Sequence, residues 1–284
     1  MSGSRLAPQW VDAPNRSVAA AGTSFAYRRL GPATGVPLLL LNHWGATLDN
    51  FDPRIVDGLA ATRPVIAIDY RGVGASGGKA PLEVAEMARD MIACIHALGL
   101  GTVDLLGFSL GGFVAQDIVR QEPDLIRKIV LAGTGPAGGV GIARVGAVSW
   151  PLIVKAMLTL RDAKFYLFFT GTTNGRGAAN AFLERLKERK TARDKSITVP
   201  AFLRQLKAIE AWGRKPPQDL GAIEKPVLVA NGDHDIMVPS SNSSDLAKRL
   251  PNAELVLYED AGHGGIFQYH QAFTEKALAF LEKA

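Results

Sequence analysis

The chain has 284 residues, of which 47% are hydrophobic and 21% charged, so it can bury a large core and wholesale disorder is excluded. Its single cysteine, Cys94, excludes an intramolecular disulfide and a cysteine-rich zinc site. The formal net charge is +5, no apolar stretch reaches the roughly 18 residues that cross a bilayer, and the first ten residues show no secretory signal, so we expect a cytoplasmic protein that does not bind membranes.

Short apolar runs alternate with segments of helical periodicity along most of the chain. Strands are predicted at residues 24–30, 36–42, 64–69, 103–108, 126–133, 226–232 and 253–259. Helices are predicted at residues 51–60, 82–100, 110–121, 244–250 and 272–284. Strands that alternate with helices indicate an α/β fold, in which a mostly parallel sheet is covered by helices on both faces.

The interval between Gly135 and Lys215 breaks this alternation. It begins with a glycine-rich stretch and continues with apolar and amphipathic helical segments, and it is too long for a simple connection between two strands. We therefore predict a helical cap at 136–215, over the carboxyl ends of the strands. The cap is inserted between a first core part at 1–135 and a second core part at 216–284.

The positive charge is concentrated in the second half of this cap. Residues 184–215 hold ten Lys and Arg residues against four Asp and Glu residues. The acidic residues are interspersed at helical spacing, and no nucleic-acid recognition motif accompanies them. We interpret the stretch as a solvated helix face, with weak steering of anionic ligands as the alternative, and we expect no nucleic-acid partner.

A serine between glycines stands out in the stretch VDLLGFSLGG, residues 103–112. A helix can follow a buried strand directly only through a sharp turn, and bulky side chains two residues before or after the turn would collide with the neighbouring strand and helix. Gly107 and Gly111 avoid that collision, so the pattern predicts that Ser109 is held out at the tip of the turn. The alternative is a glycine-rich turn without chemistry.

A serine hydroxyl is a weak nucleophile, so it needs a base that is oriented by an acid. His263 stands between the last predicted strand and the C-terminal helix, where a loop can bring an imidazole to the carboxyl edge of the sheet. Asp233 and Asp235 both follow the strand at 226–232 and are the candidate acids.

With these motifs, and with the stretches DYRGVGASGG, NGDHDIMVP and AGHGG, the sequence resembles the α/β-hydrolase fold superfamily, in its serine-nucleophile branch of haloperoxidase-like and esterase-like proteins. The resemblance covers nearly the whole chain. It implies a catalytic triad of Ser109, Asp235 and His263. Asp235 is preferred to Asp233 because the catalytic acid of such proteins commonly lies four residues before the proline of this motif.

One stretch departs from the family pattern. Haloperoxidase-like relatives carry a His-Gly pair after the third strand, whereas this chain has Asn42 and His43. The alignment implies that the backbone amides of Trp44 and Leu110 form the oxyanion hole. His43 adds bulk beside the site, where it either contacts substrate or packs against the loop. We expect His43, Trp44 and Phe108 to border the substrate pocket.

The resemblance implies a serine hydrolase that forms an acyl-enzyme on a carboxylic ester or lactone of a small, partly apolar molecule, without a cofactor or a metal ion. Alternatives with the same triad are a perhydrolase or cofactor-free haloperoxidase, and a hydrolase of C–C bonds. A further alternative is a cofactor-free dioxygenase of this fold. An alternative from another class is a ligand receptor that retains the hydrolase fold. The expected partner is the substrate alone, with monomer and homodimer both open.

Overall fold

The computed structural model describes residues 9–283. Residues 1–8, which make up most of the stretch examined for a secretory signal, and residue 284 lie outside the described residues. Its strands are β1 (Arg16–Ala20), β2 (Thr23–Leu30), β3 (Leu38–Leu41), β4 (Val65–Ile68), β5 (Val103–Phe108), β6 (Ile126–Ala132), β7 (Val227–Gly232) and β8 (Ala253–Tyr258). They form one eight-stranded sheet in the order β1-β2-β4-β3-β5-β6-β7-β8. The pairs β1–β2 and β2–β4 are antiparallel and all the others are parallel, so the predicted mostly parallel sheet is confirmed.

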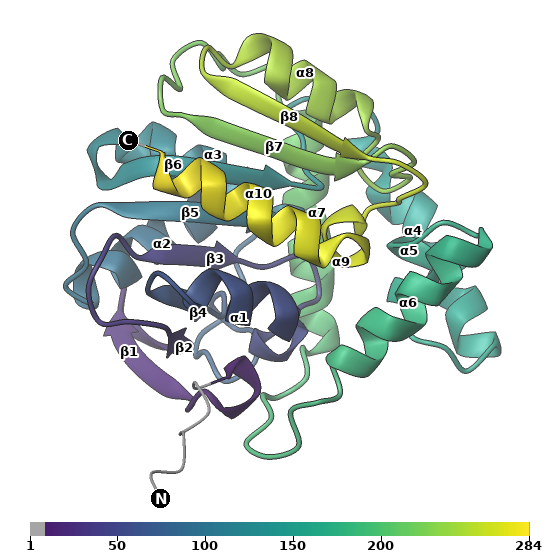
Figure 1. Ribbon diagram of the computed structural model, residues 1–284, viewed down its shortest axis with the longest axis horizontal. Coiled ribbons are helices and arrows are strands. Elements are labelled where there is room, and N and C mark those ends of the chain that lie inside the picture. The colour runs from purple at the N-terminus through teal and green to yellow at the C-terminus, as the bar shows by residue number, and fades with distance from the viewer. Residues whose placement is uncertain (1–8, 284) are drawn as a thin grey trace, which may run out of the picture.

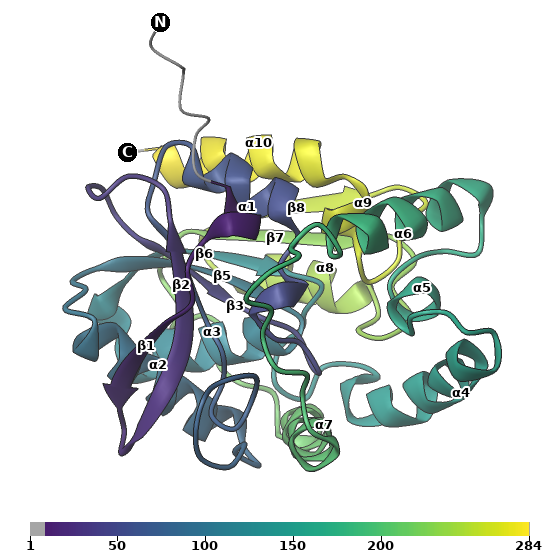
Figure 2. The same cartoon turned by 90° about the horizontal axis from the view of Figure 1, so that it is seen from below.

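Helices cover both faces of this sheet, as Figures 1 and 2 show. The core helices are α1 (Pro53–Ala60), α2 (Val84–Ala97), α3 (Leu110–Gln121), α8 (Ser241–Arg249), α9 (Gly265–Gln268) and α10 (His270–Glu282). Short 3₁₀ helices lie at Trp10–Asp12, Leu48–Asn50, Pro123–Leu125 and Ile142–Arg144. In Figure 2, α1 and α10 lie on one face of the sheet, and α2 and α3 lie on the other.

All the predicted strands and core helices are present, with ends that differ by a few residues at most. The sequence does not predict β1, because its residues are exposed or half-buried and show no apolar run. The strands β3 and β5 bury every residue, since helices cover both faces of a central parallel strand. Leu41 at the end of β3 pairs with Gly107 on β5, so the end of β3 lies beside the point where β5 turns into α3.

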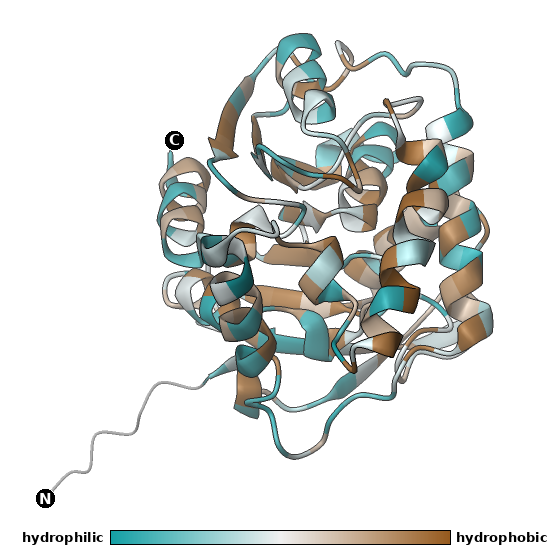
Figure 3. Cartoon of the chain, turned by 90° about the vertical axis from the view of Figure 1, so that its right-hand side faces the viewer, coloured by the Kyte–Doolittle hydropathy of each residue, from teal (hydrophilic) through white to brown (hydrophobic). Residues whose placement is uncertain are grey.

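The segment predicted as a cap contains four helices, α4 (Val145–Leu158), α5 (Lys164–Leu167), α6 (Thr173–Arg185) and α7 (Val199–Arg214). Figures 1 and 2 place α4, α5 and α6 beyond the carboxyl ends of the parallel strands. These helices carry hydrophobic and hydrophilic residues side by side, whereas the central strands are hydrophobic along their length (Figure 3). No helix within residues 9–283 has both the length and the apolar character needed to cross a bilayer.

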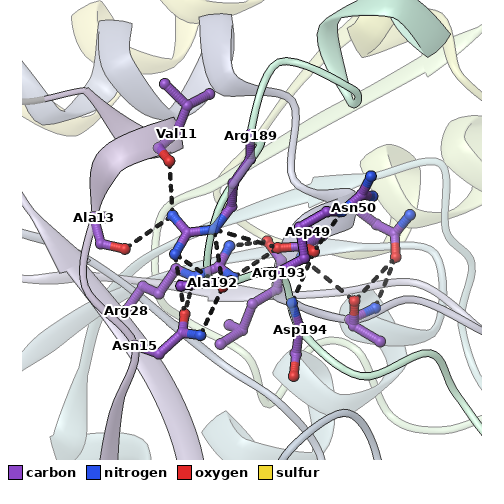
Figure 4. A network of polar contacts seen from close by, with 12 residues as sticks. Val11, Ala13, Asn15, Arg28, Asp49, Asn50, Arg189, Ala192, Arg193 and Asp194 are labelled. Carbon is purple, nitrogen blue, oxygen red and sulfur yellow. Dashed lines mark hydrogen bonds and ion pairs between the residues drawn. The ribbon is translucent and has the colours of Figure 1, made fainter.

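The loop between α6 and α7 is fastened to the N-terminal part of the chain by a polar network (Figure 4). The guanidinium of Arg189 donates hydrogen bonds to the carbonyl oxygens of Val11 (2.8 Å) and Ala13 (3.0 Å). The carboxylate of Asp49 accepts a hydrogen bond from the backbone N–H of Asp194 (2.9 Å). The interpretation of the basic stretch as a solvated face is therefore wrong for Arg189, which is only 6% exposed.

Candidate active site

Ser109 lies at the sharp turn between β5 and α3. Its backbone has φ 57° and ψ −118°, and positive φ costs a residue with a side chain about 1–2 kcal/mol. Its N–H donates to the carbonyl oxygen of Ala132 on β6 (2.9 Å), and its carbonyl oxygen accepts from the N–H of Gly112 (2.8 Å) and from Thr134 Oγ1 (2.9 Å). The neighbouring strand and helix therefore hold the serine in this strained turn.

The glycines around Ser109 leave no room for a side chain. A Cβ atom at Gly107 would collide with the backbone of Gly111, and one at Gly111 would collide with the carbonyl oxygen of Leu41 at the end of β3. A Cβ atom at Gly112 would lie 2.5 Å from the side chain of Thr134. Glycine at positions 107 and 111 therefore permits the close approach of α3 to β5 and β3 that the turn requires, and glycine at 112 leaves room for the side chain of Thr134.

The structure brings Ser109, His263 and Asp235 into one hydrogen-bonded chain. The loop after β8 places His263 Nε2 at 2.9 Å from Ser109 Oγ, and the loop after β7 places Asp235 Oδ2 at 2.7 Å from His263 Nδ1. Because a carboxylate can only accept, Nδ1 carries the proton and Nε2 is free to accept the serine proton. The other oxygen of Asp235 accepts the backbone N–H groups of Met237 (2.8 Å) and Val238 (2.9 Å), which fix the carboxylate.

Asp233, the other candidate acid, points away from the serine. Its Oδ1 pairs with Nδ1 of His234 (2.6 Å), whose side chain is 67% exposed, and accepts the backbone N–H of Ala261 (3.1 Å). Desolvation by itself would raise the pKa of Asp233, but the hydrogen bond to His234, the backbone N–H of Ala261 and the nearby charge of His234 together outweigh it and lower that pKa. The hydrogen bond to Asp233 raises the pKa of His234. This pair belongs to the loop surface, so the geometry favours Asp235 as the partner of His263.

The backbone N–H groups of the two predicted oxyanion donors, Trp44 and Leu110, have no hydrogen-bond partner among the described residues. Leu110 is the first residue of α3, so its N–H has no partner within the helix. Within residues 9–283, neither this N–H nor that of Trp44 donates a hydrogen bond. Trp44 lines the same cavity as Ser109. Free N–H groups at a cavity that holds a nucleophile are suited to bind an oxygen that gains negative charge.

His43 is buried and electrically neutral. Its Nδ1 lies 2.8 Å from the carbonyl oxygen of Trp44, so Nδ1 carries the proton. Its ring packs edge to face against the rings of Phe108 and Phe168, with ring centroids 5.5 Å and 5.1 Å apart. Burial, together with the nearby ammonium of Lys164, lowers the pKa of His43 to about 3. The imidazole therefore stays uncharged at any pH near neutrality.

A cavity of about 210 Å³ opens beside Ser109 and His263. Its wall is mostly apolar and is lined by His43, Trp44, Gly45, Ile153, Ala163, Leu167, Phe168, Phe202 and Met237. The predicted lining residues His43 and Trp44 are among them, but Phe108 is not. Phe108 is 2% exposed and packs behind the site, with its ring 5.0 Å from that of His263 and 4.8 Å from that of Phe267. The prediction that Phe108 borders the pocket is therefore wrong, and its ring packs against the imidazole of His263 instead.

The lining residues that sequence reasoning missed come mainly from the cap. The carbonyl oxygen of Phe168, directly after α5, accepts a hydrogen bond from the backbone N–H of Gly264 (2.7 Å), so the cap contacts the loop of His263 directly. Asp162 and Lys164, paired at 3.1 Å, supply the charged part of the wall. No pattern along the chain marks these residues, because each reaches the site only through the docking of the cap. Among residues 9–283, no three His, Cys, Asp or Glu side chains gather to hold a metal ion.

The chain belongs to the α/β-hydrolase family, since residues 36–268 match the model of the alpha/beta hydrolase fold. A putative carbamate hydrolase, RutD, from Agrobacterium fabrum is 29% identical, over 86% of this chain and 92% of that protein. A poly(3-hydroxyalkanoate) depolymerase from Ectopseudomonas oleovorans is also 29% identical, over 87% of this chain and 84% of that protein. The solved structure of an alpha/beta hydrolase fold protein from Chitinophaga pinensis superposes with a TM-score of 0.92 at 39% identity, covering 98% of this chain and all of that one.

Proposed function

We propose that this chain is a serine hydrolase that cleaves a carboxylic ester or lactone of a small, partly apolar molecule through an acyl-enzyme. The observation that carries the proposal is the hydrogen-bonded chain from Ser109 Oγ through His263 to Asp235, which opens on an apolar cavity. The names of the two curated relatives, a carbamate hydrolase and a depolymerase, support a hydrolytic reaction.

In the proposed reaction, Ser109 Oγ attacks the carbonyl carbon and His263 Nε2 takes the hydroxyl proton. Asp235 stabilises the imidazolium that forms and keeps it in the right orientation. The negative charge on the former carbonyl oxygen is stabilised by the N–H groups of Trp44 and Leu110, each worth roughly 3 kcal/mol of the barrier. The C=O double bond then re-forms, the bond between the acyl carbon and the alkoxy oxygen breaks, and His263 gives its proton to the leaving alcohol.

Deacylation repeats these steps with water as the nucleophile. His263 removes a proton from water, the resulting hydroxide attacks the acyl carbon, and the carboxylic acid leaves as Ser109 recovers its proton. The apolar side chains of Ile153, Leu167 and Phe202 in the cavity wall favour a substrate with a hydrocarbon portion next to the reacting carbonyl.

The test measures hydrolysis of p-nitrophenyl esters of rising chain length and of several lactones. Ser109→Ala and Asp235→Asn should each lower kcat by a factor of about a thousand or more, with the fold retained by circular dichroism. Asp233→Asn is the matched control, since that carboxylate lies on the same loop and should keep kcat within about threefold. Full turnover of an ester or lactone by Ser109→Ala, or a deeper loss in Asp233→Asn than in Asp235→Asn, would contradict the proposal.

A further inference from the structure

The cap helix α7 reaches directly into the loop that carries the proposed oxyanion donor. Gln205 Oε1 accepts a hydrogen bond from the backbone N–H of Gly45 (2.9 Å), and the indole Nε1 of Trp44 donates to the carbonyl oxygen of Phe202 (2.9 Å). The rings of Trp44 and Phe202 are stacked, with centroids 4.3 Å apart. Gly45 has φ +77°, and a Cβ atom there would lie 2.9 Å from the ring of Phe202. Glycine at this position therefore allows α7 to approach the loop.

These contacts clamp a single peptide group from both sides. The peptide between Trp44 and Gly45 offers one carbonyl oxygen and one N–H. The carbonyl oxygen of Trp44 is the partner of His43 Nδ1 (2.8 Å), and the N–H of Gly45 is the partner of Gln205 Oε1 (2.9 Å). A peptide plane held at both polar atoms cannot rotate without losing two hydrogen bonds, one buried and one partly buried. The hydrogen bond from the side chain of His43 also closes a ring that contains the His43–Trp44 peptide, so the N–H of Trp44 is restrained with it.

Gln205 is an unusual choice for a purely structural contact. Its side chain is fully buried, and its Nε2 has no hydrogen-bond partner among the described residues. Oε1 must face the N–H of Gly45, because the amide nitrogen cannot accept a hydrogen bond, so Nε2 is left as an unpaired donor. A buried unpaired donor costs about 1–3 kcal/mol, a cost that an apolar side chain of the same length would avoid. What glutamine adds, and methionine would not, is the acceptor for Gly45.

We propose that Gln205 is a positioning residue of the reaction: from the cap, it holds the Trp44–Gly45 peptide so that the N–H of Trp44 stays directed at the developing oxyanion. This inference rests on the proposed function, in which that N–H binds the oxyanion. It also makes the chemistry dependent on the seating of the cap, since the donor is held in place only while α7 is docked.

The test compares Gln205→Met with the wild type on one ester substrate. We expect kcat to fall about tenfold or more while KM changes less than threefold, because the loss concerns an interaction made in the transition state. Binding of a trifluoromethyl ketone, which forms a tetrahedral adduct on the serine, should weaken by a similar factor. The thermal midpoint should stay the same or rise, because the unpaired donor disappears.

The matched control is Arg204→Met, at the neighbouring position on α7. Its guanidinium donates to the carbonyl oxygen of Ala80, so this variant also loses one contact between the cap and the core, but at another loop. We expect it to keep kcat within about twofold. An unchanged kcat in Gln205→Met would overturn the inference. So would a loss of kcat of equal size in both variants that parallels a lowered thermal midpoint.

Two further measurements separate the possible failures. Ser109→Ala is assayed in parallel: if it retains turnover, the proposed function fails, whereas an inactive Ser109→Ala beside a fully active Gln205→Met refutes only the role of Gln205. On the wild-type protein, amide hydrogen exchange at Gly45 should be slow because its N–H is bonded to a buried acceptor. Fast exchange at Gly45 would overturn the clamp whether or not the variant folds.

Discussion

At the scale of single residues, His43 and His263 show how two imidazoles beside one serine take different roles. Both are buried, but His263 stands between a hydroxyl and a carboxylate, whereas His43 has a carbonyl oxygen at Nδ1 and no partner at Nε2 among the described residues. A carboxylate stabilises an imidazolium, and a single carbonyl oxygen does so far less. His43 is therefore suited to hold the backbone at Trp44, not to exchange protons.

The lowered pKa of His43 predicts a pH-dependent effect on stability. The pKa of this histidine is 6.5 in the unfolded chain and about 3 in the folded protein, so between these values the folded state binds fewer protons. The free energy of unfolding therefore decreases as the pH falls below 6.5. His43→Gln, which cannot titrate, should gain stability relative to the wild type by about 2 kcal/mol between pH 7 and pH 5. Urea unfolding at both pH values measures this, and a difference that is independent of pH would contradict it.

At the scale of elements, the loop between α6 and α7 meets the end of β4 at a pair of carboxyl groups. Asp69 follows β4, Asp194 lies in the loop, and an oxygen of each flanks Gly74, which has φ +57°. Both of these Oδ2 atoms are buried and lack a hydrogen-bond partner among the described residues. Burial, and then the neighbouring Asp194, raise the pKa of Asp69 well above its usual range. The junction therefore costs stability whenever both groups are forced to ionise.

The variant Asp69→Asn should stabilise this junction. The Asn amide can donate to the unpaired oxygen of Asp194 and carries no charge. When the pKa of an acid is raised in the folded state, the protein loses stability as the pH rises above the pKa of the unfolded chain. The stability gained by Asp69→Asn over the wild type should therefore be small near pH 4 and reach about 1 kcal/mol or more at pH 8. Chemical unfolding at these two pH values is the measurement. A variant that is less stable than the wild type at pH 8 would show that the ionised carboxyl is needed.

At the scale of the whole molecule, the cap and the core are joined by buried ion pairs as well as by apolar contacts. Arg185 on α6 contacts Asp52 at the start of α1 through two nitrogens (2.7 and 3.0 Å), and also donates to the carbonyl oxygen of Phe267 on α9 (2.9 Å). The side chain of Asp52 is fully buried and that of Arg185 is 11% exposed. One guanidinium thus connects the cap, the first core part and the loop region behind His263.

This connection predicts that the cap and the core unfold together. Arg185→Met leaves a buried carboxylate without its cation and should lower the free energy of unfolding by about 3 kcal/mol. Urea transitions followed by far-ultraviolet circular dichroism and by tryptophan fluorescence should still coincide. Lys187→Met is the control, because its pair with Glu184 is exposed to solvent and contributes little to stability. Separate transitions in Arg185→Met, with the main one unchanged, would mean that the cap unfolds independently.

Much of the fold and the central part of the site could be predicted from the chain itself. The sharp turn at Ser109 depends on steric exclusion between residues close in sequence, and the buried strands β3 and β5 appear as continuous apolar runs. His263 and Asp235 follow strands of one parallel sheet, whose carboxyl ends meet at a common edge, so their approach to the serine follows from the order of elements. The half-exposed strand β1 carries no such pattern and could not be predicted.

The rest of the site depends on how the cap packs against the core, which the sequence alone does not show. The contact of Gln205 with Gly45, that of Phe168 with Gly264, and the place of Phe108 behind His263 join segments far apart in the chain. Such contacts depend on the angle and depth at which helices pack, and several apolar or polar side chains would satisfy the same local periodicity. Local sterics and the order of elements therefore pointed to Ser109, His263 and the two candidate acids, and the family resemblance selected Asp235. The shape of the cavity and the contact of Gln205 with the Trp44–Gly45 peptide arise from tertiary packing.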